Sequence, residues 1–183
     1  MTTGTFVYTS VTDIFDNLDA DQALLSGKTV TITDAISLAE LGTISTAVGG
    51  GGSVVYSKIT DTASNLAGSN SDTLNGKTVV ISDSTTLSEL ATIEGFVGST
   101  PTYTSVNGNG SEIGTTNAST AAKLNGRTLT INNNATADEY RQAITNAGAG
   151  SVTGAVRETA SAKLASGTAA LTGATSITLF VQN

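Results

Sequence analysis

One sequence pattern occurs three times in this chain, at residues 25–49, 74–98 and 124–148. The clearest copy, 74–98, reads LNGKTVVISDSTTLSELATIEGFVG. A chain with this self-similarity folds as an array of like units, because each unit buries its apolar face only against its neighbours. A residue that recurs at the same place in each copy is therefore explained first by its role in the repeat, and only then as a reactive group.

Each copy begins with a glycine, a basic residue and a threonine, and apolar residues then alternate with hydroxyl residues. Side chains alternate between the two faces of a strand, so this pattern predicts a short strand with one apolar face. The residues expected on that buried face are Val30, Ile32, Val79, Ile81, Leu129 and Ile131.

A helix is predicted directly after each of these strands. Each begins at a capping box, in which a hydroxyl side chain and a glutamate satisfy each other's backbone N–H groups. An apolar stripe at helical spacing follows, and a glycine ends it. The predicted boxes are Ser37/Glu40, Thr86/Glu89 and Thr136/Glu139, and the terminating glycines are Gly49, Gly98 and Gly148.

A second strand and helix precede each copy. Residues 7–13 predict a strand, with Asp13 capping the short helix that follows, and the same pattern returns at 55–66. It is looser at 103–110, where an Asn-Gly-Asn-Gly run replaces the Asp cap. The predicted organisation is a single repeat domain over 1–183, with repeats at 7–53, 54–101 and 102–150 and a degenerate C-terminal cap at 151–183.

The predicted fold class is α/β, as a solenoid of half-repeats of about 24 residues, within the range of leucine-rich repeat units. Its strands would form one parallel sheet on one face, with helices covering the other. The alternative is a series of separate small α/β domains, each with two strands and two helices. That arrangement buries less surface per unit.

The amino-acid composition limits the reactions and binding partners that can be expected of this chain. The chain has no histidine and no cysteine, so it lacks the commonest general base and the thiol nucleophile, and we expect no enzymatic activity. Its net charge of −7 repels nucleic acid and anionic membrane. No signal peptide or membrane span is evident. We expect a protein that is soluble or is assembled into a larger structure from the cytoplasm.

Several motifs invite a chemical interpretation. The carboxylate pairs Asp13/Asp16 and Asp19/Asp21 are more simply explained as helix caps and first-turn acids. The Gly-Lys-Thr triplets at 27–29 and 76–78 resemble the end of a phosphate-binding loop, but the upstream glycine is absent and each triplet opens a strand. We therefore predict no catalytic and no cofactor-binding residues.

Two binding alternatives stay open. Aspartates at strand ends could form a calcium ladder, although the glycine-aspartate repeat of calcium-binding β-rolls is missing, and no metal ligand is predicted. Threonine-rich strands could form an ice-binding plane, but Val80 interrupts it. The aspartates concerned are Asp13, Asp34, Asp61 and Asp83, and the predicted interaction face comprises Tyr8, Tyr56, Tyr103, Thr29, Thr31, Lys77, Thr78, Arg127 and Thr128.

Two elements carry a resemblance to known repeats: Tyr-x-x-[Ile/Val]-Thr-Asp-Thr-Ala-x-Asn-Leu at 56–66, and Gly-Lys-Thr-Val-x-Ile-x-Asp at 76–83. They resemble repeats of very large cyanobacterial and other bacterial surface or type I secreted proteins. They are also similar to repeats in structural proteins of bacteriophages that infect such hosts. The resemblance covers most of residues 7–148, and such repeats scaffold and display.

The resemblance implies a non-enzymatic structural protein on the exterior of a bacteriophage particle, as a capsid knob, decoration or tail-appendage subunit. Its partners would be other virion proteins or further copies of itself, and its location the virion surface. One alternative is a repeat segment of a bacterial cell-surface or secreted adhesin. Another is an appendage that binds host-surface glycan.

Overall fold

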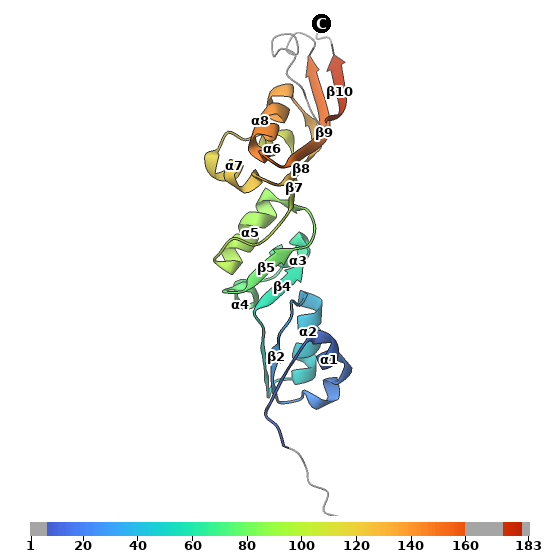
Figure 1. Ribbon diagram of the computed structural model, residues 1–183, viewed down its shortest axis with the longest axis vertical. Coiled ribbons are helices and arrows are strands. Elements are labelled where there is room, and N and C mark those ends of the chain that lie inside the picture. Colours follow the sequence, from blue (N-terminus) through green and yellow to red (C-terminus); the bar gives the residue numbers. More distant parts are fainter. Residues whose placement is uncertain (1–6, 160–173, 181–183) are drawn as a thin grey trace, which may run out of the picture. The chain divides into compact units, whose positions relative to one another are not determined.

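The computed structural model describes residues 7–159 and 174–180 (Figure 1). The chain divides into two compact units. Unit 1 comprises residues 1–82 and 92–102, and unit 2 comprises 83–91 and 103–183. Strands and helices alternate along the chain, and every strand pair in the described residues is parallel. The predicted α/β class with parallel pairing is therefore confirmed.

Unit 1 contains two small sheets, ordered β1-β2-β3 and β4-β5. An isolated parallel bridge joins Ile36, just ahead of α2, to Ile59 of β4. Its elements are β1 (Ser10–Asp13), α1 (Phe15–Ala20), the 3-10 helix η1 (Gln22–Leu24), β2 (Thr29–Ile32), α2 (Leu38–Val48), β3 (Ser53–Val55), β4 (Lys58–Asp61), α3 (Ala63–Ala67), α4 (Ser71–Leu74) and β5 (Thr78–Ile81).

Unit 2 contains one five-stranded sheet in the order β10-β9-β8-β7-β6, and α6 and α8 pack against β8 (Figure 1). Helix α5 (Leu87–Val97) begins among the residues of unit 2 and ends among those of unit 1. The elements of unit 2 are β6 (Thr85–Thr86), β7 (Ser105–Gly108), α6 (Gly110–Ile113), α7 (Ala118–Leu124), β8 (Thr128–Ala135), α8 (Ala137–Ala147), β9 (Ser151–Thr159) and β10 (Ala174–Phe180).

The single sheet expected from the sequence is divided into three. The reason is visible at 53–61, where the extended chain is interrupted between β3 and β4. Strand β3 pairs with β2, whereas β4 pairs with β5, so the segment changes its main partner halfway along. The sequence pattern predicted a strand that begins at residue 55, and it did not anticipate a separate strand β3 paired with β2.

The predicted capping boxes and terminating glycines of α2, α5 and α8 are confirmed. Ser37 and Thr136 form full capping boxes with Glu40 and Glu139. Thr86 exchanges the same two hydrogen bonds with Glu89. The three terminating glycines, Gly49, Gly98 and Gly148, have φ of 69°, 71° and 57°. A side chain at such a φ would be strained, which explains why glycine stands at each position.

The strand residues predicted to be buried are all buried, with Val30 and Leu129 fully inaccessible. The first core cluster is formed mainly by Leu18, Leu25, Val30, Ile32 and Ile44. Strands β9 and β10 lie in the predicted C-terminal cap, 151–183. Residues 160–173 and 181–183 of that cap lie outside the described residues. None of the helices in the described ranges is long and apolar enough to cross a membrane.

Candidate functional site

Three tyrosine–cation pairs recur at the start of the repeats. The cation lies over the ring at 4.9 Å from its centroid for Lys28 and Tyr8, 4.4 Å for Lys77 and Tyr56, and 4.3 Å for Arg127 and Tyr103. A cation over an aromatic face is attracted by the ring quadrupole, by about 0.5–1 kcal/mol at exposed sites and more when desolvated. We call each pair a tyrosine–cation clasp.

Hydrogen bonds fix both members of the second and third clasps, and in the first the Tyr8 hydroxyl donates to the carbonyl of Leu24 at 2.8 Å. The Tyr56 hydroxyl donates to the carbonyl of Thr73 at 2.9 Å, and Lys77 Nζ donates to the carbonyl of Tyr56 at 3.0 Å. The Tyr103 hydroxyl donates to the carbonyl of Lys123 at 2.9 Å, and Arg127 donates to the carbonyl of Tyr103 at 2.7 Å. The clasp residues of the predicted interaction face therefore bind one another and hold the two strands of a repeat together.

Exposure of the tyrosine differs between the clasps. Tyr8 is 36% exposed, Tyr56 is half-buried, and Tyr103 is only 2% exposed. The expectation that the tyrosine rings face solvent or a partner is wrong for Tyr103, because its ring is enclosed and its hydroxyl is bound internally. Whether the rest of the interaction face binds a partner stays a prediction.

The predicted threonines lie on the sheet faces that carry hydroxyl side chains. Thr29 pairs with Ser10 of β1 and Ser53 of β3, and the Ser53 hydroxyl donates to the Thr29 hydroxyl at 3.2 Å. Thr128 pairs in the same way with Ser105 and Ser151. These rows are exposed or half-exposed and carry no charge. The remaining members are Thr31, which is half-buried, and Thr78, which is exposed and pairs with Lys58.

Two of the strand-end aspartates, Asp34 and Asp61, cap helices, but each caps a helix that precedes it in the chain. Asp34 Oδ1 accepts from the backbone N–H of Phe15 at 3.0 Å, and Asp61 Oδ2 accepts from that of Leu38 at 2.9 Å. Asn133 Oδ1 accepts from Gly110 at 2.9 Å. In each case a side chain from one half-repeat caps the helix of the half-repeat before it. We call this contact an inter-half cap.

The Asp13 prediction needs correction. Helix α1 begins at Phe15, and its N-cap is Ile14, which makes no side-chain cap hydrogen bond. Asp13 Oδ1 instead accepts from the Ile14 backbone at 2.9 Å and from Asn17 Nδ2 at 2.8 Å. The first N–H group of α1 is bound by Asp34, 19 residues away. A local sequence pattern identifies an aspartate beside a helix start but not which aspartate caps it.

Asp61 is the most enclosed of the aspartates, with 9% of its surface exposed. Burial raises the pKa of its carboxyl, but hydrogen bonds from the Asn65 side chain and from the backbones of Leu38 and Thr62 outweigh burial. The net pKa therefore lies below its ordinary value. Three hydrogen-bond donors of the fold favour the ionised carboxylate, which is the environment of a structural cap rather than of a general acid.

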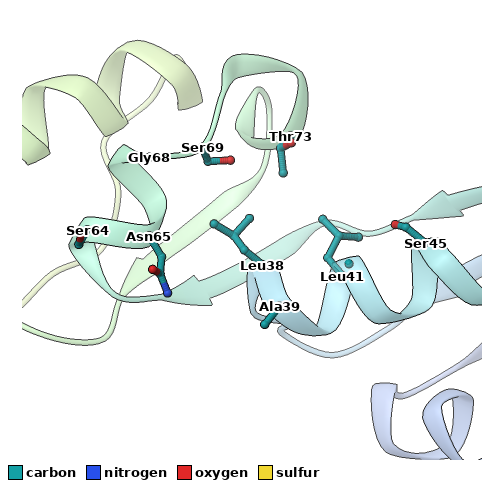
Figure 2. Close-up of a pocket in the computed structure, with 10 residues that line it drawn as sticks. Leu38, Ala39, Leu41, Ser45, Ser64, Asn65, Gly68, Ser69 and Thr73 are labelled. Atoms are coloured by element: carbon teal, nitrogen blue, oxygen red, sulfur yellow. The ribbon is translucent and has the colours of Figure 1, made fainter.

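A shallow groove runs beside α2 in unit 1, with a volume of about 600 Å³. Leu38 and Leu41 project from α2 toward the side of the groove that carries Ser69 and Thr73 (Figure 2). No ionisable side chain lines the groove. It offers apolar contact and a few hydroxyl groups, and no acid–base pair.

The described residues contain no group of three or more Asp, Glu, His or Cys side chains placed to hold a metal ion. The calcium alternative therefore finds no donor set there, since Asp34 and Asp61 direct their oxygens at backbone N–H groups. The inter-half caps found among the described residues were not predicted from the sequence. The available signal was the recurrence of Asp34, Asp83 and Asn133 at one offset after each predicted strand.

Comparisons of the chain with protein-family models, with curated proteins and with solved structures find no match.

Proposed function

We propose that this chain is a non-enzymatic structural protein on the exterior of a bacteriophage particle, as a capsid knob, decoration or tail-appendage subunit. One observation carries the proposal: the polar side chains that recur with the repeat are engaged in joining its parts. The inter-half caps of Asp34, Asp61 and Asn133 occupy side-chain oxygens with backbone N–H groups. The resemblance of the repeat to phage structural proteins supports the virion setting.

We propose further that the half-repeats stack as a solenoid, which is the finer form of the fold. Parallel registers between successive segments support this, including Thr29 with Ser53 in unit 1 and Thr128 with Ser151 in unit 2. Neighbouring parallel strands lie about 4.8 Å apart, so each half-repeat would lengthen the body by that distance. Small-angle scattering of the purified chain tests this, because a solenoid gives a rod-like profile and separate flexible domains do not.

Each unit has its own proposed contact surface: in unit 1 the uncharged hydroxyl row around Thr29 together with the exposed Tyr8 clasp, and in unit 2 the uncharged hydroxyl row around Thr128. Such a surface gives up few charges on burial, so contact with another virion protein or another copy carries a small desolvation cost. No nucleic acid or membrane partner is proposed, since the net charge is −7.

Electron microscopy with an antibody against the chain, combined with quantitative mass spectrometry of purified phage particles, tests the proposal. We expect the chain at a fixed stoichiometry relative to the major capsid protein, and label on the particle exterior. Finding the chain only as a free monomer in the culture medium would reject it.

A cell-surface or secreted adhesin is the second candidate, favoured by the resemblance to large bacterial surface proteins. The same antibody separates the two candidates. Label on intact, uninfected bacterial cells assigns the chain to the cell surface, and label confined to particles assigns it to the virion.

A further inference from the structure

The strand–helix half at β1–α1 and the one at β4–α3 are built alike. Asp61 Oδ1 accepts from the backbone of Thr62 at 2.8 Å and from Asn65 Nδ2 at 2.7 Å. Asp13 Oδ1 accepts from Ile14 and Asn17 in the same arrangement, at 2.9 and 2.8 Å. The two halves therefore present equivalent backbone and carboxylate groups at their outer edge, which is the strand edge that faces away from the paired strand, β2 for β1 and β5 for β4.

In repeat 2 this outer edge is occupied by the segment that leads into α2. The carbonyl of Lys58 accepts from the backbone of Ile36 at 3.3 Å, and the backbone of Thr60 donates to the carbonyl of Ile36 at 3.0 Å. Two residues later, the backbone of Leu38 donates to Asp61 Oδ2 at 2.9 Å. An extended apolar residue followed by a capped helix thus fits the edge, with three hydrogen bonds.

In repeat 1 the same three groups lie open among the described residues. They are the carbonyl of Ser10, the N–H of Thr12 and Asp13 Oδ2, the counterparts of the Lys58, Thr60 and Asp61 groups. Among the described strands, β1 stands at the end of its sheet and pairs only with β2. Within the same residues, the hydrogen bonds donated to Asp13 all reach its other oxygen, Oδ1.

A second, independent feature lies at the same place. Of the five large apolar residues most exposed in the described chain, four lie between residues 7 and 24. They are Val7, Tyr8, Ile14 and Leu24, with exposures of 85%, 36%, 41% and 56%. Soluble proteins rarely gather exposed apolar groups in one area unless another surface covers them.

Two of these residues, Tyr8 and Leu24, line a cavity of about 240 Å³. Its other lining residues are Val11, Leu18 and Leu25, which are apolar, and Asp13, Asn17 and Asp21. In repeat 2 the counterparts of Asn17 and Leu24 are Asn65 and Thr73, which lie across the groove of Figure 2 from α2. The counterpart of Tyr8 is Tyr56, which lines a second cavity together with Leu41 and Val48 of α2. The surface that α2 covers in repeat 2 is therefore uncovered in repeat 1, where it is also more apolar.

We propose that this end of unit 1, made of Ser10, Thr12, Asp13 and the apolar cavity, is a docking site for a segment of another protein. That segment has an extended apolar residue, then a hydroxyl N-cap and an amphipathic helix of the α2 kind. The extended residue pairs with β1, the first helical N–H donates to Asp13 Oδ2, and the apolar face of the helix enters the cavity. The inference rests on this geometry and stands whether or not the chain belongs to a virus particle.

Charge complementarity agrees with a helix N-terminus as the incoming group. The site carries Asp13 and Asp21, and no basic residue lines its cavity. The N-terminus of a helix presents unpaired N–H groups and a partial positive charge, which a carboxylate stabilises. A partner that offered a helix C-terminus to Asp13 would be repelled.

The test titrates the isotope-labelled 183-residue chain with a synthetic peptide of residues 35–49, the segment that fills the edge in repeat 2. Amide shifts are followed by NMR. We expect shifts at 10–13, at Asn17 and at Leu24. Asp13→Ala removes a charged acceptor and should weaken binding about tenfold or more. Leu24→Glu alters only an exposed cavity residue and should weaken binding similarly.

The matched control is Asp16→Ala, which removes the same charge from an exposed position on α1 outside the cavity, and it should leave binding unchanged. Absence of shifts up to millimolar peptide overturns the proposal. Shifts confined to β4 and α3 also overturn it, because they report exchange with α2. Concentration-dependent dimers of the chain alone that Asp13→Ala abolishes, seen by sedimentation, overturn the assignment to a foreign partner and give the site to a second copy.

Discussion

Helix α2 of unit 1 and helix α8 of unit 2 occupy the same place in the repeat, yet they are held by different chemistry. On α2, Leu41 is half-buried beside an open groove, and the helix start is bound by the buried carboxylate of Asp61. On α8, the corresponding position is Tyr140, which is fully buried and donates to the carbonyl of Val152 at 3.1 Å.

The C-terminal ends of the two helices also differ, because α8 again has a more deeply buried side chain than α2. Ala47 of α2 is partly buried against the first core cluster. Its counterpart in α8 is Asn146, a buried amide that donates to the carbonyls of Ile113 and Thr115 at 2.8 and 2.9 Å. In this repeat the caps and glycines set where each helix begins and ends, and they recur in every copy. The side-chain contacts that hold each helix against the rest of its unit differ from one copy to the next.

The largest expected effect is the difference in stability loss between substitutions at two equivalent helix positions, Tyr140 and Leu41. Tyr140→Ala should destabilise the protein by about 3–5 kcal/mol, because a fully buried aromatic ring and its hydrogen bond are lost. Leu41→Ala should cost about 1–2 kcal/mol, because Leu41 is half-exposed. Urea unfolding followed by circular dichroism gives both values, and hydrogen exchange assigns each to its unit. Equal losses would mean that the two helices are packed alike.

Asn146→Ala tests how much the two hydrogen bonds donated by the Asn146 amide stabilise α8. It leaves the buried carbonyls of Ile113 and Thr115 without their donor, so we expect a loss of about 2–3 kcal/mol in the free energy of unfolding. Thr145→Ala, an exposed neighbour on the same helix, serves as the control and should change stability by about 0.5 kcal/mol or less. A loss no larger than that of the control would show that water replaces the amide.

Asp61→Ala tests the inter-half cap of α2. The backbone N–H of Leu38 and the amide of Asn65 lose their acceptor, and we expect a loss of about 2 kcal/mol. Protection of the α2 amides against hydrogen exchange should fall more than that of the α8 amides. Uniform loss across both units would contradict a cap that acts on α2.

The smallest effect is the pH dependence that Asp61 confers. Its pKa in the folded protein lies below the ordinary value of 3.8, so the folded state favours the ionised carboxylate. The stability it contributes is fully present above that ordinary value and is lost as the pH falls through the lower folded pKa. Asp61→Asn should therefore flatten the acid side of the stability profile. An unchanged acid limb in the variant would assign the dependence to other carboxylates.

The sequence predicted the parts of the fold that depend on near neighbours. The Ser37/Glu40 box and Gly49 are recognisable because each acts within one helix turn, and the buried faces of β2 and β5 follow from a period of two. The inter-half cap of Asp61 was not predicted, because its partner is 23 residues away and depends on strand register. The burial of Tyr103 was missed for the same reason, since alternation alone does not reveal which rings a neighbouring segment encloses.

The central claim is that a side chain from one half-repeat caps the helix of the half before it. The most direct measurement is an NMR pH titration of the Leu38 backbone amide in the full chain and in Asp61→Asn. We predict that the Leu38 amide proton shifts as Asp61 is protonated, with a midpoint below 3.8, and that the shift disappears in the variant. A Leu38 amide that does not respond to pH, or that responds identically in the variant, would contradict the account.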